Sequence, residues 1–230
     1  MSSIQFFVVF HSILYDDNYK DIKKEDLDRY FTFVAVNSKK SKKYTKGKYK
    51  IINEWELPNY DEKFQEQGYN ENSVIYHLYI NNIYNYDKIG FFQYDMKFNK
   101  DFVNYVLENN INSFYLEPHN FFTISSNCYD KIIKYVIEDY ENYRNIKFVK
   151  KKDYPMLNCY IIDKNDYVKI MRWVTTLYNK LYPWSLDITN REKSASAGHI
   201  GGIFEAIMAL GVKEYDSLSF KSLKTYVKHK

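Results

Sequence analysis

The sequence predicts one α/β domain with a central, mostly parallel sheet flanked by helices. Apolar, strand-like runs alternate with helix-like patterns along the 230-residue chain. The first run is almost continuous in Val and Phe, which is typical of a strand covered on both faces. No internal repeat, low-complexity linker or abrupt change in composition divides the chain, and its length suits one large domain. We therefore expect a single domain over residues 1–230.

The expected strands are the longer apolar segments at residues 4–10, 31–36, 88–93 and 158–163, with shorter candidates at 51–52 and 113–116. His11 and Ser12 follow the first strand, and a polar cluster with Gln93 and Asp95 follows residues 88–92. Ligands of doubly wound sheets bind outside the carboxyl ends of the strands. These residues are therefore the first site candidates, although His11 can equally be a plain strand end.

Helical patterns occur at residues 24–30, 59–67, 71–81, 101–110, 128–143, 165–181 and 197–210. We expect Gly68 and Gly211 to follow two of these helices as C-terminal caps. Asn70 should cap the start of the helix at 71–81, in which His77 is expected to be partly buried. Pro183 should break the long helix, because proline lacks the N–H that a helix interior needs.

The composition limits the classes of partner. Aromatic residues make up 19% of the chain, with 25 Tyr and 16 Phe, and the abundance of Lys, Asn and Ile is typical of an AT-rich genome. Many Tyr should be core residues whose hydroxyl groups need hydrogen-bond partners. The net charge of +4 is only mildly basic, and the aromatic residues follow core periodicity instead of accompanying the lysine runs. A single-stranded nucleic-acid binder is therefore the weakest hypothesis, and we expect no nucleic-acid partner.

Cysteine usage and hydropathy indicate the compartment. Cys128 and Cys159 stand far apart and lack metal-binding spacing. No secretory signal precedes them, the N-terminal apolar run is too short to span a bilayer, and no other stretch reaches that length. We expect reduced thiols and a cytoplasmic protein without a transmembrane segment.

A second candidate region is the small-residue stretch 187–205. Three of the seven glycines in the chain, Gly198, Gly201 and Gly202, fall in one window of five consecutive positions within this stretch. Small residues at a helix start let a ligand approach the backbone, and exposed N–H groups there favour anions such as a diphosphate. His199 is then a candidate metal ligand and Arg191 a candidate phosphate clamp. The alternative is tight helix packing, with His199 bonded to a backbone carbonyl.

Five segments together resemble one family, in this order: Phe7-Val-Val-Phe-His11, Asn70-Glu71, Ile89-Gly-Phe-Phe-Gln-Tyr-Asp95, Cys159-Tyr-Ile-Ile-Asp163 and Gly198-His-Ile-Gly-Gly-Ile-Phe-Glu205. The order is similar to GT-A-type glycosyltransferase-like domains of large DNA viruses and capsular-polysaccharide enzymes. The resemblance is diffuse and covers roughly residues 4–212. It implies a Rossmann-like fold and, if the source is viral, a place in the host cytoplasm. The family's Asp-x-Asp metal motif corresponds to Gln93-Tyr94-Asp95, so the first acid is missing.

The resemblance implies a division of labour along the chain. Residues 1–110 would bind the nucleotide sugar, residues 111–212 would hold the acceptor and the catalytic face, and residues 213–230 would be a covering segment or tail. Metal ligands would be Asp95 and His199, catalytic residues Glu205 and Asp187, and donor-binding residues His11, Ser12, Gln93, Tyr94, Arg191 and Gly198. Mn²⁺ or Mg²⁺ would bridge the diphosphate of a UDP-type donor. An Asp just past a strand can also cap a turn, and this alternative for Asp95 stays open.

Two functions follow from the resemblance. The leading hypothesis is a metal-assisted glycosyltransferase that moves a sugar from a nucleotide-diphosphate sugar to a glycan or protein acceptor. The alternative is a catalytically inactive relative that binds carbohydrate or serves in assembly, because the first acid of the motif is missing. If His199 and Asp95 hold the same ion, Mn²⁺ should support binding better than Mg²⁺, since imidazole suits Mn²⁺ better.

Overall fold

The computed structural model describes residues 3–11, 13–36, 48–109, 113–114, 130–148, 158–191, 200–214 and 221–229. The strands are β1 (Ile4–Phe10), β2 (Phe31–Ala35), β3 (Ile51–Asn53), β4 (Lys88–Gln93), β5 (Met96–Phe98), β6 (Ser113–Phe114), β7 (Tyr160–Asp163), β8 (Lys221–Ser222) and β9 (Val227–His229). The helices are α1 (Lys24–Tyr30), α2 (Glu62–Glu66), α3 (Glu71–Ile80), α4 (Phe102–Glu108), α5 (Asp130–Arg144), α6 (Lys164–Arg191) and α7 (Ile200–Glu214), with short 3-10 helices η1 (Asp16–Asn18) and η3 (Glu54–Glu56).

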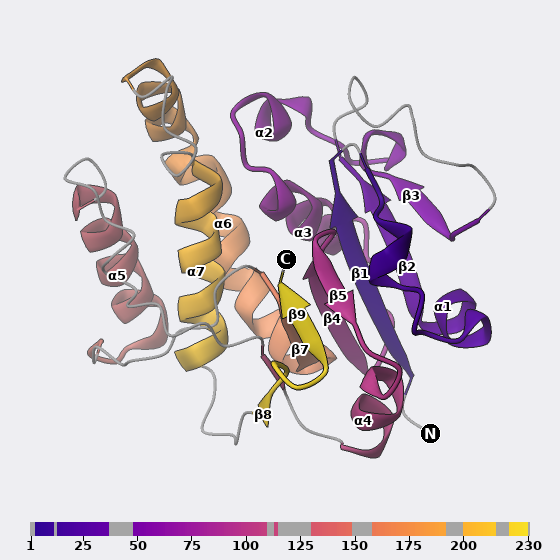
Figure 1. The fold of residues 1–230 in the computed structure, drawn as a ribbon. Coiled ribbons are helices and arrows are strands. Elements are labelled where there is room, and N and C mark those ends of the chain that lie inside the picture. The colour runs from indigo at the N-terminus through magenta and orange to yellow at the C-terminus, as the bar shows by residue number, and fades with distance from the viewer. Residues whose placement is uncertain are drawn as a thin grey trace.

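The central sheet is mixed and mostly parallel, which confirms the predicted fold class (Figure 1). Its seven strands follow the order β3-β2-β1-β4-β7-β6-β8. β3, β2, β1 and β4 run parallel to one another, and β6 and β8 are also parallel. β7 runs antiparallel to β4, with Tyr160 opposite Phe91. The first residues of β7 therefore lie beside the carboxyl end of β4, where the site candidates stand.

Side chains of the strands alternate between two hydrophobic clusters, one on each face of the sheet. In β1, Phe7 and Val9 belong to one cluster with residues of α3, α5, α6 and α7. Phe6, Val8 and Phe10 belong to the other, with residues of α1, β5, α4 and β9. All seven residues of β1 are buried, as expected for a strand covered on both faces.

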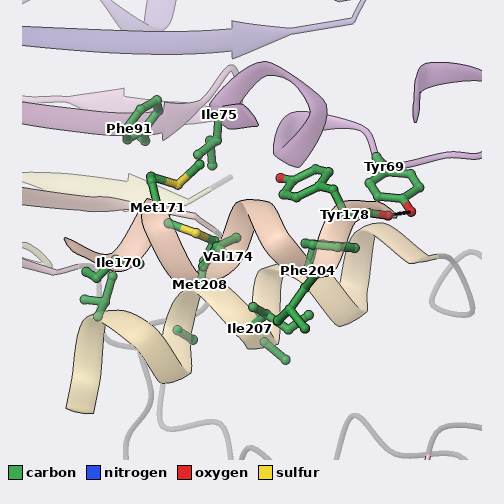
Figure 2. Packing of buried hydrophobic residues seen from close by; sticks show 14 of the residues in the cluster. Tyr69, Ile75, Phe91, Ile170, Met171, Val174, Tyr178, Phe204, Ile207 and Met208 are labelled. Carbon is green, nitrogen blue, oxygen red and sulfur yellow. Dashed lines mark hydrogen bonds between the residues drawn. The ribbon is translucent and has the colours of Figure 1, made fainter. Parts of the chain in front are cut away.

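The larger cluster lies between the sheet and the pair α6 and α7 (Figure 2). In the figure, Met171 and Val174 of α6 point toward Ile75 of α3 and Met208 of α7. Two buried tyrosines here satisfy their hydroxyl groups on backbone carbonyls, as expected from the composition. The Tyr178 hydroxyl donates to the carbonyl of Asn72 at 2.6 Å, and the Tyr69 hydroxyl donates to that of Tyr178 at 3.3 Å.

Two predicted helix ends are wrong. α6 continues through Pro183 to Arg191, and the turn around the proline is supported by a buried Leu181 and by the Ser185 hydroxyl, which donates to the Tyr182 carbonyl at 2.6 Å. Gly211 lies inside α7, which ends at Glu214. A Cβ at Gly211 would stand 2.9 Å from Cγ2 of Ile170, so this glycine permits the close approach of α7 to α6.

Gly68 has the expected left-handed conformation, with φ 78°, after α2. The local structure differs from the prediction at three other places. Asn70 precedes α3, but its side chain makes no capping hydrogen bond and its φ is 52°. His77 is wholly buried, not partly. Residues 96–98, which no sequence pattern singled out, form β5 and pair with β9. Residues 227–229 of the C-terminal segment therefore pair with a strand of the preceding chain.

Gly90→Ala should destabilise the protein by about 1–3 kcal/mol, the usual cost of overpacking a core. A Cβ at this position would lie 2.7 Å from Cδ1 of Phe6, 3.1 Å from Cε2 of Phe92 and 3.3 Å from Cγ1 of Ile161. Urea unfolding would show the loss as a lower midpoint at unchanged slope. An unchanged midpoint would mean that the aromatic cluster on this face repacks without cost.

Candidate active site

The candidate active site lies at the carboxyl ends of β1 and β4. The two strands are parallel neighbours, with Val9 opposite Gln93, so His11 and the Gln93-Tyr94-Asp95 segment reach the same edge of the sheet. β4 ends at Gln93, and Tyr94 and Asp95 form a turn into β5. The alternation that would point the side chains of Gln93 and Asp95 in one direction therefore stops before Asp95.

Asp95 is held by the C-terminal strand. β9 pairs with β5, with His229 opposite Met96, as Figure 1 shows in the yellow arrow beside β5. The Nε2 atom of His229 lies 3.0 Å from Oδ2 of Asp95. The other oxygen, Oδ1, is buried and has no hydrogen-bond partner among the described residues. A buried carboxylate oxygen without a donor is costly, so this atom is suited to accept a ligand.

His11 pairs with an acid from another element. Its Nε2 atom lies 2.7 Å from Oε1 of Glu71, the first residue of α3. A carboxylate at a helix N-terminus is favoured by the helix dipole. The His11 ring also meets the edge of Tyr94, with centroids 6.0 Å apart, and Tyr15 stacks on Tyr94 at 5.8 Å. This aromatic group borders the site on the side of β1.

Three carboxylates from separate elements act on one buried thiol. Burial raises the pKa of Cys159 well above its usual value, and the nearby charges of Glu205, Asp95 and Glu71 raise it further. The hydrogen bond with the Gln93 backbone acts in the opposite direction. The charges of Glu205 of α7, Glu71 of α3 and Asp95 therefore all act on Cys159, which directly precedes β7 beside the end of β4.

A chain of amides adds one more acceptor at this edge. The Asn72 amide nitrogen donates to the carbonyl of Gly201 at 2.9 Å, so its Oδ1 must accept, and it does so from the Asn158 amide at 3.2 Å. The orientation of Asn158 is fixed in this way, and its own Oδ1 is buried without a partner among the described residues. Asn158 is only 4% exposed and has a left-handed φ of 48°.

A second polar cluster carries the residue types of a hydrolytic triad but not its geometry. His77 lies 2.7 Å from Glu54 and 3.2 Å from the hydroxyl of Ser73, and its Nε2 accepts the N–H of Asp61 at 2.9 Å. Both side chains of the His77–Glu54 pair are fully buried. Because a backbone amide occupies the second ring nitrogen, His77 has no remaining position from which to take a proton from a substrate. This cluster is structural.

Comparison with known proteins supports the fold. No protein-family model matches the chain, and neither does any curated protein. Among solved structures, the chain is similar to the apo form of the bifunctional glycosyltransferase WbbM, with a TM-score of 0.60 and 13% sequence identity, over 96% of this chain and 44% of WbbM. The chain thus spans less than half of that protein. Mouse xyloside xylosyltransferase 1 matches at a TM-score of 0.35 and 10% identity, over 96% of this chain and 84% of that protein, which is too distant to add to the argument.

The described residues bring together only part of the predicted site. His11, Gln93, Tyr94 and Asp95 share one edge of the sheet, and the charge of Glu205 reaches it. Asp187 and Arg191 lie in the last turns of α6, where only the backbone is described. Ser12, Gly198 and His199 lie outside the described residues. The structure adds Glu71, Asn158 and His229 to the residues at this edge. Of these three, the sequence pattern singled out only Glu71, as part of the pair Asn70-Glu71.

The described residues do not form a complete metal site by themselves. In the described part of the chain, no three His, Cys, Asp or Glu side chains are grouped as they would be around a metal ion. Asp95 and His229 form a pair, and one Asp95 oxygen is available. A hard divalent ion bound through one or two protein ligands takes its other ligands from phosphates and water, so this pair fits such an ion.

No helix among the described residues is both long and apolar enough to cross a bilayer.

Proposed function

We propose that this chain is a glycosyltransferase that takes a sugar from a UDP-type nucleotide-diphosphate sugar, with a divalent cation, and transfers it to a glycan or protein acceptor. The observation that carries the proposal is the buried Asp95 oxygen without a donor, at the carboxyl edge of parallel strands. This is where open α/β sheets bind ligands. The fold similarity to WbbM, a bifunctional glycosyltransferase, supports the reaction class.

The cation would be held by Asp95 together with an imidazole. His229 is a candidate because its Nε2 lies 3.0 Å from Asp95, and His199 stays a candidate from the sequence. Mn²⁺ or Mg²⁺ supplies Lewis-acid stabilisation of the departing diphosphate when it is bound. The acid-rich edge supports a cation requirement, since Glu71, Glu205 and Asp95 would repel an uncompensated diphosphate.

Protein groups around this position would orient the donor. His11, steadied by Glu71, and the neighbouring Tyr94 would border the nucleoside, together with Ser12 and Gln93. Arg191 and Gly198 would contact the diphosphate. The Oδ1 atom of Asn158, which has no partner among the described residues, would accept a hydrogen bond from a hydroxyl group of the transferred sugar. The sugar would supply the donor that this buried oxygen lacks.

Glu205 and Asp187 are proposed as the catalytic residues. The charge of Glu205 acts on the same thiol as that of Asp95, which supports a position beside the transferred sugar. A carboxylate there can accept the proton of the acceptor hydroxyl or stabilise positive charge on the sugar ring. We propose that residues 1–110 supply the donor site and residues 111–212 the acceptor side.

A thermal-shift panel of nucleotide sugars, with and without Mn²⁺, tests the function. A ligand that binds only the folded state raises the melting temperature by mass action, by an amount that grows with its concentration over Kd. We expect a UDP-sugar with Mn²⁺ to raise it and either component alone to raise it less. A panel without any metal-dependent shift would reject the donor class.

A second candidate is an inactive relative that binds carbohydrate. It is favoured by Gln93, which stands where the resembled family has its first acid. Incubation of the protein with UDP-sugar and Mn²⁺ separates the two. Release of UDP, by transfer or slow hydrolysis, supports the enzyme, and metal-dependent binding without release supports the inactive relative.

Comparing His199→Ala with His229→Ala should identify the imidazole that accompanies Asp95. Imidazole suits Mn²⁺ better than Mg²⁺, so loss of the ligating ring should narrow the difference in affinity between the two ions. We expect His229→Ala to lower Mn²⁺-dependent UDP-sugar affinity by about 10- to 100-fold, as is usual for groups that support a metal site. Calorimetric titration of both variants with both ions gives the four affinities. If His199→Ala alone narrows the difference, His229 only supports Asp95.

A further inference from the structure

A hollow of about 440 Å³ lies outside the candidate site, beside α1. Among the described residues, eight members of the segment 16–28 line it together with Lys48 and Tyr49, so we call it the α1 hollow. In Figure 1, α1 lies beside β2, near the edge of the sheet that is far from α5. Its volume is within the range of small-molecule pockets, about 300–1,000 Å³.

The lining of the α1 hollow combines an apolar floor with a balanced set of charges. Leu27 and the ring of Tyr49 contribute the partly exposed apolar part, above the buried Ile22 and Tyr19. The charged residues are Asp16, Asp17, Asp28, Lys20, Lys24 and Lys48. Among the described lining residues, three carboxylates and three ammonium groups cancel, so these residues favour neither a phosphate nor a cation. It suits a neutral ligand that both donates and accepts hydrogen bonds.

The polar groups are already oriented. Asp16 accepts a hydrogen bond from the Tyr49 hydroxyl at 2.5 Å and pairs with Lys48 at 2.5 Å. The Lys48 ammonium and the Tyr49 hydroxyl hold the pKa of the Asp16 carboxyl below its usual value, so it stays an ionised acceptor. Tyr49 in turn packs on Phe33 of β2, with ring centroids 4.6 Å apart. One wall of the α1 hollow is thus anchored to the sheet.

The α1 hollow is joined to the candidate site through one backbone carbonyl. The buried Asn18 donates to the carbonyl of Tyr94 at 3.0 Å, and the Tyr19 hydroxyl donates to the same oxygen at 3.4 Å. Asp95 is the next residue. The segment that forms one wall of the α1 hollow therefore also fixes the turn that carries the proposed metal ligand.

We infer that the α1 hollow is a saccharide-binding site, occupied by a neutral portion of a glycan. Sugar hydroxyls can donate to the aspartates and accept from the lysines, and the C–H faces of the rings can cover the apolar floor. A nucleotide is disfavoured, because its phosphates gain nothing from described lining residues whose charges cancel. That the bound glycan is the acceptor rests on the proposed function; that a saccharide binds does not.

Amide chemical shifts of the ¹⁵N-labelled full chain test the inference. The probes are methyl glycosides of glucose, galactose, mannose and N-acetylglucosamine, and cellobiose, lactose and chitobiose, without metal or nucleotide. At least one should shift amides of residues 16–24, Lys48 and Tyr49 in a saturable way. Asp16→Ala should weaken that probe at least about tenfold, the usual effect of losing an ionised acceptor.

Matched controls come from the same segment. Asp21→Ala and Lys23→Ala change exposed residues that do not line the α1 hollow, and both should leave the affinity unchanged, whereas Lys24→Ala should lower it. The inference is overturned if no probe shifts these amides, if uridine shifts them and no saccharide does, or if the shifts appear only at Glu71, Asp95 and Asn158. Metal-dependent UDP release is measured separately, so the α1 hollow and the proposed transferase can fail independently.

Discussion

Asp95→Ala is expected to abolish metal-dependent binding of a UDP-sugar, with a loss of about 100-fold or more in affinity, or about 2.7 kcal/mol. Asp95 is the carboxylate nearest to His229, and its buried Oδ1 is the acceptor that the proposed cation would occupy. Titration calorimetry with UDP-sugar and Mn²⁺ measures the loss. The fold should survive, because the Asp95 side chain is 25% exposed and lies in a turn, where loss of an ion pair costs about 1 kcal/mol or less.

Asp101→Ala is the matched control. Asp101 is an exposed acid six positions further on, before α4, and its side chain makes no capping bond. It should bind like the wild type. Asp95→Asn separates charge from shape, since an amide keeps one carbonyl oxygen but cannot neutralise a cation; it should lose most of the affinity. If Asp95→Ala binds UDP-sugars with unchanged metal dependence, Asp95 only caps the turn, and the site is elsewhere.

The fold was accessible from the sequence because burial on both faces leaves a strong local signal. Residues 4–10 form a nearly continuous apolar run and residues 89–92 a short one, and both segments form strands at the predicted positions. Their ends, His11 and Gln93, then meet because parallel neighbours finish at the same edge. This part of the site follows from topology alone.

The other members of the site depend on contacts that no local pattern encodes. His229 reaches Asp95, 134 positions earlier, only because the two three-residue strands β9 and β5 pair. Glu71 was visible next to Asn70, but its partner His11 stands 60 positions earlier. Asn158 owes its orientation to Asn72 and Gly201 on two helices. Such residues can be assigned only after the elements are placed in space.

The predictions of two helix ends failed for a related reason, since tertiary packing outweighs local propensity. Pro183 and Gly211 are strong stop signals in isolation. In the protein the apolar faces of α6 and α7 pack against each other over their length, with Ile170 against Gly211. The free energy of that burial exceeds the cost of one missing backbone hydrogen bond or one flexible residue.

Support for the site also comes from the buried cluster around Glu54. Its carboxylate accepts hydrogen bonds from the Ser73 hydroxyl, from His77 at 2.7 Å and from the Gln65 amide at 2.8 Å. The Gln65 amide donates as well to the carbonyl of Asn70 at 3.0 Å. Asn70 directly precedes Glu71, the partner of His11. The cluster therefore ties η3 and α2 to the start of α3, where one wall of the candidate site begins.

Glu54→Ala should consequently be among the most destabilising substitutions, at about 3–5 kcal/mol, because it leaves the buried donors of Ser73 and His77 without their acceptor and removes one acceptor of the partly buried Gln65 amide. Ser73→Ala removes one donor and should cost about 1 kcal/mol. Glu56→Ala, an exposed acid two positions away, should stay within about 0.5 kcal/mol. Urea midpoints at constant slope measure all three. A loss below about 1 kcal/mol for Glu54→Ala would mean that the carboxylate gains little over its desolvation cost, and that burial of the surrounding aromatic rings holds α2 against α3.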